Sequence, residues 1–255
     1  MPTNYTYQGA ELELFATARH WKAYWSGIVS QYVGSRVLDV GAGAGATIRQ
    51  LHNRQQEKWL ALEPDARLAE QILHDQAAGI VSGNVEVRVG TISELRSCEM
   101  FDTILYIDVL EHIADDRSEL QKAAHRLAAG GNLVVLGPAH QSLFSAFDAT
   151  IGHFRRYDRK SLLNLTPSGL KPCCVMYLDC VGLLASMWNR LVLKASNPSS
   201  RQIQLWDNWM VPVSRFIDRL VMYNIGKSIL VVWRGESHER ETIARCPRNR
   251  CASTA

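Results

Sequence analysis

Short runs of apolar residues recur along the chain and alternate with segments whose apolar residues follow a helical period. Five runs are predicted to be strands buried on both faces: 36–41, 58–65, 85–90, 101–109 and 131–137. Two further strands are predicted after a long loop: 171–179 and 228–235. Helices are predicted over 47–56, 65–78 and 116–129, the last of them ended by Gly130 and Gly131. This alternation predicts an α/β fold with a doubly wound parallel sheet.

The alternation is interrupted between the last two predicted strands. Residues 181–225 are expected to form two amphipathic helices separated at 196–200, with the second helix restarting near Pro212. Its apolar residues are predicted to share one stripe: Trp206, Trp209, Met210, Val213, Phe216, Ile217 and Leu220. The predicted division of the chain is a helical cap (1–35), a core (36–180 and 226–235), a helical insertion or lid (181–225) and a flexible tail (236–255).

Composition is that of an ordinary globular protein. Of the 255 residues, 47% are hydrophobic and 21% are charged, and the net charge of +3 is too small to indicate a nucleic-acid partner. The first residues lack a cationic segment followed by an apolar run, so we expect no secretory signal and a cytoplasmic location. The most apolar window, 173–193, contains Asp179, Asn189 and Arg190, which argues against a membrane span.

The six cysteines show no spacing typical of a zinc site or a disulfide framework. Carboxylates cluster only around the glycine-rich turn described next, so no dedicated site for a divalent cation is expected. The sequence therefore predicts a protein without a bound metal.

A glycine-rich turn follows the first predicted strand, in the stretch VLDVGAGAGA at 37–46. Glycines there let the backbone approach a nucleotide closely. Acids occupy the strand ends near this turn: Asp39, Glu63, Asp65 and Asp108. Carboxylates at this edge favour the cationic S-adenosylmethionine over the pyrophosphate of a dinucleotide, although Asp39 alone could simply bond to amides of its own loop. Glu63, 22 residues after Gly41, is placed to accept hydrogen bonds from a ribose.

The stretch from about Arg36 to Pro138 resembles the class I S-adenosylmethionine-dependent methyltransferases, in the motifs VLDVGAGAG, LALEPD, VGTISEL, FDTILYIDVLEHI and GGNLVVLGP. The resemblance implies a Rossmann-like, seven-stranded, mostly parallel sheet with a reversed last strand, and S-adenosyl-L-methionine as cofactor. It implies these cofactor contacts: Asp39, Gly41, Ala42 and Gly43 for the methionyl end, Glu63 and Pro64 for the ribose, Gly90, Thr91 and Ile92 for the adenine, and Ile107 and Asp108 at the end of the fourth strand. Many members have an acid at the position of Thr91, so adenine recognition is expected to use backbone contacts and apolar packing.

Two candidate catalytic histidines follow the fourth and fifth predicted strands. His112, in DVLEH, lies one helical turn after Asp108, and its alternative role is to cap or pack a helix. His140, in GPAHQ, directly follows the fifth strand, and its alternative is a solvated loop residue.

The stretch FDATIGHFRRYD, 147–158, resembles a GHxRRY element found in a subset of these methyltransferases. His153 is the candidate base, and Tyr157 is expected to face the pocket beside it. Arg155 and Arg156 are candidate clamps for an acceptor carboxylate or phosphate. Alternatively, the two arginines pair with nearby aspartates and hold the loop.

Tryptophans of the cap and the insertion are expected to shape an apolar acceptor pocket: Trp21, Trp25, Trp188, Trp206 and Trp209. A homodimer interface or a helix pair that touches lipid are competing roles for the insertion. The sequence thus predicts a methyltransferase acting on a small, largely apolar acceptor, with oxygen favoured and carbon or nitrogen open, in natural-product or lipid/isoprenoid-type biosynthesis. The alternatives are a non-catalytic S-adenosylmethionine-binding scaffold and a nicotinamide-dependent oxidoreductase, which the acidic turn disfavours.

Overall fold

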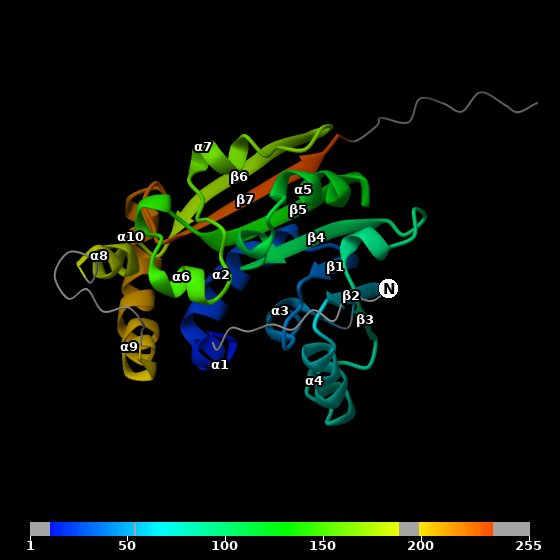
Figure 1. Ribbon diagram of the computed structural model, residues 1–255, viewed down its shortest axis with the longest axis horizontal. Coiled ribbons are helices and arrows are strands. Elements are labelled where there is room, and N and C mark those ends of the chain that lie inside the picture. Colours follow the sequence, from blue (N-terminus) through cyan, green and yellow to red (C-terminus); the bar gives the residue numbers. More distant parts are fainter. Residues whose placement is uncertain (1–10, 54, 189–198, 237–255) are drawn as a thin grey trace, which may run out of the picture.

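The computed structural model describes residues 11–53, 55–188 and 199–236 (Figure 1). Its seven strands are β1 (Arg36–Val40), β2 (Lys58–Glu63), β3 (Val85–Val89), β4 (Phe101–Ile107), β5 (Leu127–Pro138), β6 (Leu170–Leu178) and β7 (Ser228–Gly235). They form one sheet in the order β3-β2-β1-β4-β5-β7-β6, in which only β7 runs antiparallel to its neighbours. The predicted α/β class, the seven strands and the reversed last strand are confirmed.

Helices cover both faces of the sheet. The α-helices are α1 (Glu11–Ala16), α2 (Arg19–Val29), α3 (Ala46–Leu51), α4 (Ala66–Ala77), α5 (Asp116–Ala124), α6 (Ala146–Thr150), α7 (Arg159–Leu163), α8 (Cys180–Trp188), α9 (Ser200–Leu205) and α10 (Val211–Leu220). Short 3₁₀ turns are η1 (Ser30–Tyr32), η2 (Ile92–Glu94), η3 (Leu110–His112) and η4 (Gln141–Leu143), and η6 (Trp206–Met210) is a π-helical stretch.

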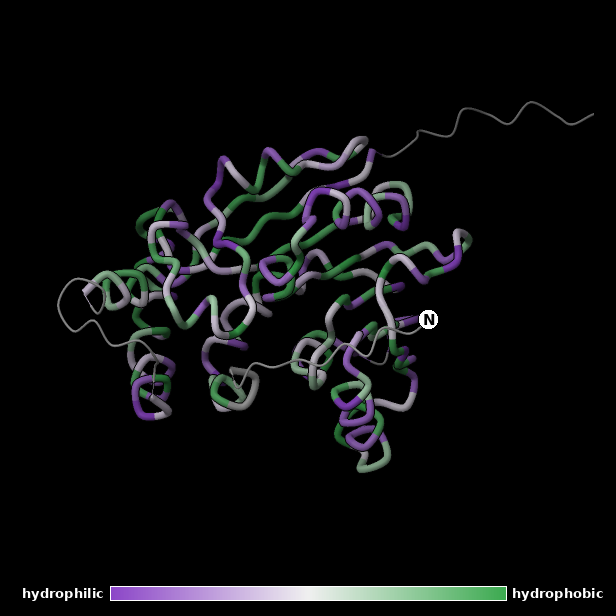
Figure 2. Tube along the Cα trace, viewed as in Figure 1, coloured by the Kyte–Doolittle hydropathy of each residue, from purple (hydrophilic) through white to green (hydrophobic). Residues whose placement is uncertain are grey.

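Two apolar clusters fill the spaces between the helices and the sheet. One cluster joins one face to α2, α3, α4 and α10, and the other joins the opposite face to α5 and α7. In Figure 2 the hydrophobic colour is concentrated in the central strands, as expected for strands buried on both sides. This is the doubly wound arrangement, which places ligands at the carboxyl ends of the parallel strands.

The predicted helix over 116–129 is wrong at its C-terminal end. Helix α5 ends at Ala124, and Leu127 already pairs with Phe101 as the first residue of β5. Leu127 is buried in the apolar cluster on that face, and Gly130, with a φ of 75°, lets the chain bulge before the regular ladder resumes at Asn132. Tertiary packing therefore overrides the helical spacing of this segment. The predicted helix over 47–56 likewise ends early, at Leu51.

The second insertion helix does not restart at Pro212. Helix α9 continues through η6 into α10, and Pro212 lies in the first turn of α10. The predicted single apolar stripe is also wrong, because Trp206 is buried while Trp209 points to solvent. Ser214 and Asp218 occupy the buried face of α10 instead, together with Val211.

Buried carboxylates explain why the polar face of α10 points inward. Asp218 accepts hydrogen bonds from the backbone N–H groups of Asp179 (2.7 Å) and Cys180 (3.0 Å), at the start of α8, and from the hydroxyl of Tyr24 (2.8 Å). Asp207 similarly accepts from the N–H of Trp21 (2.8 Å), in the first turn of α2. Both carboxylates thus satisfy orphan N–H groups at helix N-termini and interact favourably with the helix dipoles.

Within the described ranges, no helix is both long and apolar enough to cross a bilayer. Residues 1–10 of the predicted cap and 237–255 of the predicted tail lie outside those ranges.

Candidate active site

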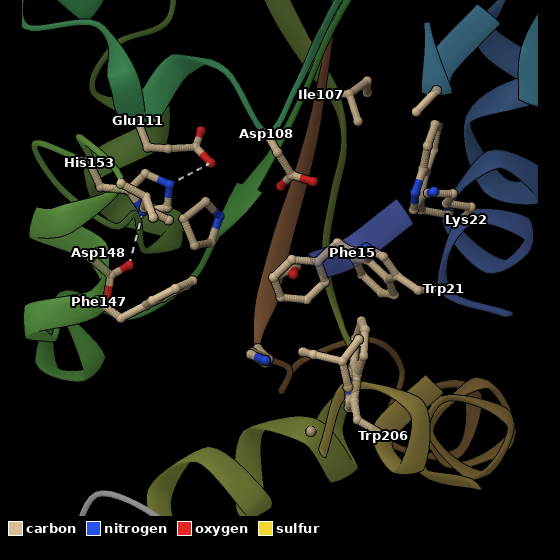
Figure 3. Close-up of a pocket in the computed structure, with 18 of the residues that line it drawn as sticks. Phe15, Trp21, Lys22, Ile107, Asp108, Glu111, Phe147, Asp148, His153 and Trp206 are labelled. Carbon is tan, nitrogen blue, oxygen red and sulfur yellow. Dashed lines mark hydrogen bonds and ion pairs between the residues drawn. The ribbon is translucent and has the colours of Figure 1, made fainter. Parts of the chain in front are cut away.

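A large cavity of about 1950 Å³ opens at the carboxyl ends of β1 and β4. Its lining comes from α1, α2, the glycine-rich turn, the loop between β5 and α7, and the insertion helices. Figure 3 shows two contrasting walls: Glu111, Asp148 and His153 lie on one side, and an aromatic group lies on the other. Asp108 lies between the two walls.

The glycine-rich turn forms one end of the cavity, and its conformation requires glycine. Gly41, Gly43 and Gly45 all have positive φ angles, of 66°, 55° and 79°. A Cβ on Gly41 would lie 2.7 Å from a methyl group of Val109. The N–H of Gly43 donates to the carboxylate of Glu63 at 2.8 Å. The turn is therefore held against β2 in a single conformation. Gly41, Ala42 and Gly43 line the cavity as expected.

Asp39 and Glu63 lie behind this turn and are not part of the cavity lining. Both are buried, and burial raises the pKa of each carboxyl group, with Glu63 adding to the rise of the pKa at Asp39. Oδ2 of Asp39 makes no hydrogen bond to any described residue. A buried carboxylate oxygen without a partner is costly, so the turn is electrostatically suited to a cationic group.

The residues predicted at the ribose and adenine lie outside the cavity lining: Glu63, Pro64, Gly90, Thr91 and Ile92. Ile92 is packed in an apolar core cluster, and Thr91 caps η2 together with Glu94. Asp65 caps α4 and pairs with Arg67 at 2.8 Å, which gives this acid a structural role. The cofactor contacts of this group stay predictions.

Asp108 and Ile107 line the centre of the cavity. Asp108 adopts a positive φ of 53°, and burial raises its pKa to about 6, against the lowering effect of His153 and Lys227. Lys227 also lines the cavity, where its ammonium lies 5.1 Å from the ring centre of Trp206. Burial lowers the pKa of Lys227, with the nearby acids acting in the opposite direction.

His153 is held in the cavity wall by a buried acid. Its Nδ1 lies 2.9 Å from Oδ1 of Asp148, and its Nε2 lies 3.9 Å from Oε1 of Glu111. Burial opposes the ionisation of Asp148, but hydrogen bonds from His153 and Arg156 outweigh it and hold the pKa of Asp148 below its usual range. With Nδ1 engaged by a carboxylate, the Nε2 of neutral His153 is the proton acceptor. This geometry is compatible with a general base, and the catalytic role of His153 stays a prediction.

His112 and Glu111 complete this wall. His112 also lines the cavity and packs edge-on against His153, with 4.5 Å between the two ring centres. Burial lowers the pKa of His112 to about 4. Glu111 is buried, and neither of its carboxylate oxygens makes a hydrogen bond to a described residue. Burial raises the pKa of Glu111 well above its usual range, and the nearby Asp108 raises it further. Because ligand atoms of Glu111, His112 and His153 lie within 4.8 Å of one another, these three residues could hold a divalent cation.

Two candidate catalytic residues do not reach the cavity, His140 and Tyr157. His140 stacks on Tyr177 at 5.2 Å, and its ring nitrogen Nε2 lies 2.9 Å from the carbonyl of Gly226. Tyr157 is buried in a core cluster. The prediction that these side chains face the pocket is wrong, because each side chain packs and forms hydrogen bonds elsewhere in the fold.

The arginines of the GHxRRY-like stretch are structural anchors. Arg155 pairs with Asp116 at 2.6 Å, outside the cavity, where the hydroxyl of Tyr157 donates to the same carboxylate at 2.9 Å. Arg156 lines the cavity but makes two hydrogen bonds to Asp148, of 2.8 and 2.9 Å. The clamp predicted for an acceptor anion is therefore already occupied by aspartates of the protein.

The opposite wall is aromatic. The ring centres of Phe15 and Trp21 lie 5.9 and 5.8 Å from the ring centre of Trp206. All three side chains line the cavity, as does Trp25. The indole N–H of Trp206 donates to Asp179 at 2.7 Å, which fixes the ring. Trp188 also lines the cavity, at an exposed part of its rim.

Trp209 does not line the cavity, so the structure gives no support to its predicted role in substrate binding. It lies on the exposed face of the insertion, because Asp207 and Asp218 hold the opposite face of the helices inward.

Sequence reasoning missed three cavity residues that carry chemistry. Glu111 is in the quoted DVLEH motif, one residue before the histidine that was singled out. Asp148 lies five residues before His153 and is one of the nearby aspartates that the sequence offers as partners for the arginines, but not as a partner for the histidine. Lys227, directly before β7, had no signal in the sequence, because only the folded insertion brings it beside Trp206.

Residues 38–133 match a family described as "Methyltransferase domain". Over 103 residues the chain is 32% identical to the ubiquinone biosynthesis O-methyltransferase of Bradyrhizobium sp. (strain ORS 278). The alignment covers 40% of this chain and 39% of that protein. The chain thus spans about two fifths of the length of this curated relative.

Two solved structures share the fold at low sequence identity. Geranyl diphosphate C-methyltransferase from Streptomyces coelicolor A3(2), solved with Mg²⁺, geranyl diphosphate and S-adenosyl-L-homocysteine, has a TM-score of 0.61 at 11% identity and covers 88% of this chain and 82% of its own. Coclaurine N-methyltransferase, bound to N-methylheliamine and S-adenosylhomocysteine, has a TM-score of 0.56 at 17% identity and covers 83% of this chain and 71% of its own. At these identities the likeness establishes the fold.

Proposed function

We propose, from the premise that residues 38–133 are a class I S-adenosylmethionine-dependent methyltransferase domain, that this chain methylates a small and largely apolar acceptor at an oxygen atom. The observation that carries the proposal is the pair formed by His153 and Asp148, which presents a proton acceptor to a cavity whose other wall is aromatic.

The residues near the glycine-rich turn suit the cofactor chemically. When bound, S-adenosylmethionine supplies an electrophilic methyl group on a positively charged sulfur. Asp39, with an unpaired buried oxygen, and Asp108 would stabilise its positive charges, and Gly41 to Gly43 would allow close approach of the backbone. Glu63 is proposed to reach the ribose, with Gly90 to Ile92 near the adenine.

This arrangement disfavours a dinucleotide. The carboxylate of Glu63 occupies the N–H of Gly43, one of the amides that would otherwise cradle a pyrophosphate. A phosphate at the turn would meet a negative charge at close range. The nicotinamide-dependent alternative is therefore not supported by the charges at the turn.

The acceptor is proposed to lie between the two walls. Trp21, Trp25 and Trp206 would stack against an apolar or aromatic body, while His153 would contact the reacting hydroxyl. Nε2 of His153 would take the hydroxyl proton as the oxygen–carbon bond forms, and Asp148 would stabilise the resulting imidazolium. The products are then a methyl ether, a neutral thioether and one proton on His153.

An oxygen acceptor is favoured over nitrogen or carbon for two reasons. A base fixed by a buried aspartate is useful where a hydroxyl must lose its proton. The relative from Bradyrhizobium is named as an O-methyltransferase, although it matches over only 39% of its length. A role in natural-product or lipid/isoprenoid-type biosynthesis and a cytoplasmic location stay predictions, as do a homodimer and a peripheral lipid contact.

Two measurements test the proposal. Titration calorimetry with S-adenosylhomocysteine and with NADH should give binding for the first ligand only. Incubation with methyl-labelled S-adenosylmethionine and a panel of phenols and isoprenoid-substituted phenols should label an acceptor in wild type and not in His153→Ala. Cofactor binding without labelling of any acceptor would favour the non-catalytic scaffold, and binding of NADH alone would refute the proposal.

A further inference from the structure

An exposed apolar stripe runs along the rod formed by α9, η6 and α10. The outer stripe consists of Leu205, Trp209, Val213, Phe216 and Leu220. Spacings of three or four residues place these side chains on one side of a helix. Trp209 is 73% exposed, Phe216 67% and Leu220 68%. An exposed apolar surface of this extent marks an interaction site.

The outer stripe cannot turn into the core, because the opposite side of the rod is fixed. The hydroxyl of Ser214 donates to Oδ1 of Asp179 at 2.7 Å, and Asp218 accepts two backbone N–H groups at the start of α8. Rotation of the rod would break these hydrogen bonds of buried polar groups, which is costly. The apolar face is thus a stable feature of the folded chain.

Cationic residues accompany the outer stripe. Arg201, Arg215 and Arg219 are exposed on the same rod, and none of them takes part in a salt bridge within the described ranges. Both acids between residues 200 and 220, Asp207 and Asp218, are buried. The exposed surface of the rod is therefore apolar and positively charged, which is the composition of helices that lie on anionic membranes.

The apolar surface continues to the rim of the cavity. Leu205, at one end of the outer stripe, lines the cavity as well as being exposed. Leu184 and Trp188 of α8 also line the cavity and are also exposed at the surface. A surface that contacts the outer stripe would thus lie close to the cavity opening.

We propose that the rod lies in the interface of an anionic lipid bilayer, with the outer stripe among the acyl chains and Arg201, Arg215 and Arg219 on the lipid phosphates. Because no described helix is long and apolar enough to cross a bilayer, the chain lies on the membrane surface. If the proposed function holds, an acceptor with a long apolar tail enters the cavity from the membrane past Leu205.

A second copy of the chain fits this surface less well. In a two-fold symmetric dimer the same patch meets itself, so the arginines of the two copies would be brought close together at the interface. No exposed acid of residues 200–220 would offset this repulsion. A membrane with anionic headgroups supplies the complementary charge that a second copy lacks.

Vesicle sedimentation with the purified full chain tests the proposal. The probes are vesicles of phosphatidylcholine alone and vesicles containing about one third phosphatidylglycerol, at low and high salt. We expect binding to the anionic vesicles that weakens with salt. Trp209→Ser with Phe216→Ser should weaken binding about tenfold per residue, because each change removes a large apolar side chain from the acyl region. Arg215→Gln with Arg219→Gln should weaken binding about fivefold per residue.

A matched control comes from exposed apolar residues outside the stripe. Leu73 of α4 and Ile80 just after it are 49% and 61% exposed, and α4 lies at the other end of the molecule in Figure 1. The double variant Leu73→Ser with Ile80→Ser should bind vesicles like wild type. Equal loss in this control, or equal binding of wild type to neutral and anionic vesicles, would overturn the proposal.

Light scattering in solution separates lipid from a second copy. Wild type should be a monomer in the absence of vesicles, and a dimer that Trp209→Ser with Phe216→Ser dissociates would overturn the proposal in favour of a self-interface. Vesicle binding needs neither cofactor nor acceptor, whereas calorimetry with S-adenosylhomocysteine tests the proposed function. The two can therefore fail independently. Unchanged calorimetry in the stripe variant would show that it is folded.

Discussion

The imidazole of His153 and the carboxylate of Asp148 are in hydrogen-bond contact, with 2.9 Å between Nδ1 and Oδ1. Asp148 is buried and also receives two hydrogen bonds from Arg156. The carboxylate therefore stays ionised and fixes both the ring and its proton. This is the contact from which the proposed base chemistry follows.

Replacing His153 should separate turnover from cofactor binding. His153→Ala is expected to lower kcat about 100-fold or more, because it removes the group that takes the acceptor proton. Asp148→Asn should lower kcat less, about tenfold, because the ring remains but its proton is no longer fixed. Steady-state kinetics with labelled cofactor measure both. His74→Ala, at an exposed histidine of α4, is the control, and equal losses of kcat and of cofactor affinity at His153 would indicate a folding role instead.

Removing the acids behind the glycine-rich turn should weaken cofactor binding. Asp39→Asn and Glu63→Gln are each expected to cost about 1–3 kcal/mol of binding free energy, as the loss of a charge-assisted interaction does. In Glu63→Gln the amide oxygen of the new side chain can still accept the N–H of Gly43, but the contact of the other carboxylate oxygen with the N–H of Asp65 is lost. Calorimetry with S-adenosylhomocysteine gives the affinity, and Glu57→Gln at an exposed position is the matched control. Unchanged affinity in both variants would refute the assignment of these two acids.

Cofactor affinity should depend on the pH through Asp108. Burial raises the pKa of this carboxyl group to about 6, so it is charged above that pH and neutral below it. Only the charged form attracts a cation, and the affinity should therefore be about tenfold weaker at about pH 5 than at about pH 7.5. Calorimetry with S-adenosylmethionine across this range measures the change. In Asp108→Asn the dependence should become shallower, because the buried carboxyl groups of Asp39 and Glu63, whose pKa values are also raised, remain. The same slope in this variant as in wild type would assign the dependence to another group.

Metal removal tests the cluster of Glu111, His112 and His153. The sequence predicts no metal, so protein dialysed against EDTA should keep its activity and gain nothing from added Mg²⁺ or Zn²⁺. The structure nevertheless places three ligand atoms within 4.8 Å of one another. Loss of turnover with EDTA, restored by a divalent cation in wild type and not in Glu111→Gln, would contradict the prediction and identify the ligands.

The strands were predictable because their signal is local. Ile104 to Ile107 is an apolar run of the kind that a parallel sheet buries, and Val37 to Val40 is apolar except for Asp39 and leads directly into the glycine-rich turn. The contact between Asp148 and His153 could have been predicted for the same reason, since both residues belong to one short stretch.

The insertion was not predictable because its orientation depends on distant partners. The periodicity of Trp209, Val213 and Phe216 indicates an apolar face, and the ordinary expectation is that such a face is buried. The buried acceptors Asp207 and Asp218 reverse this expectation, because their partners are backbone N–H groups of α2 and α8. The periodicity of apolar residues in the sequence cannot predict contacts with such distant backbone groups. The orientation of His140 and Tyr157 away from the pocket was not predictable for a related reason. Neither a position directly after a strand, as for His140, nor membership of the GHxRRY-like stretch, as for Tyr157, specifies what packs against the side chain.

Asp207 and Asp218 couple three helices mechanically. One carboxylate joins the insertion to the first turn of α2, and the other joins it to the start of α8, so displacing the insertion alone would break hydrogen bonds to both helices. Without such breakage, a widening of the aromatic wall would have to move the cap and the insertion together.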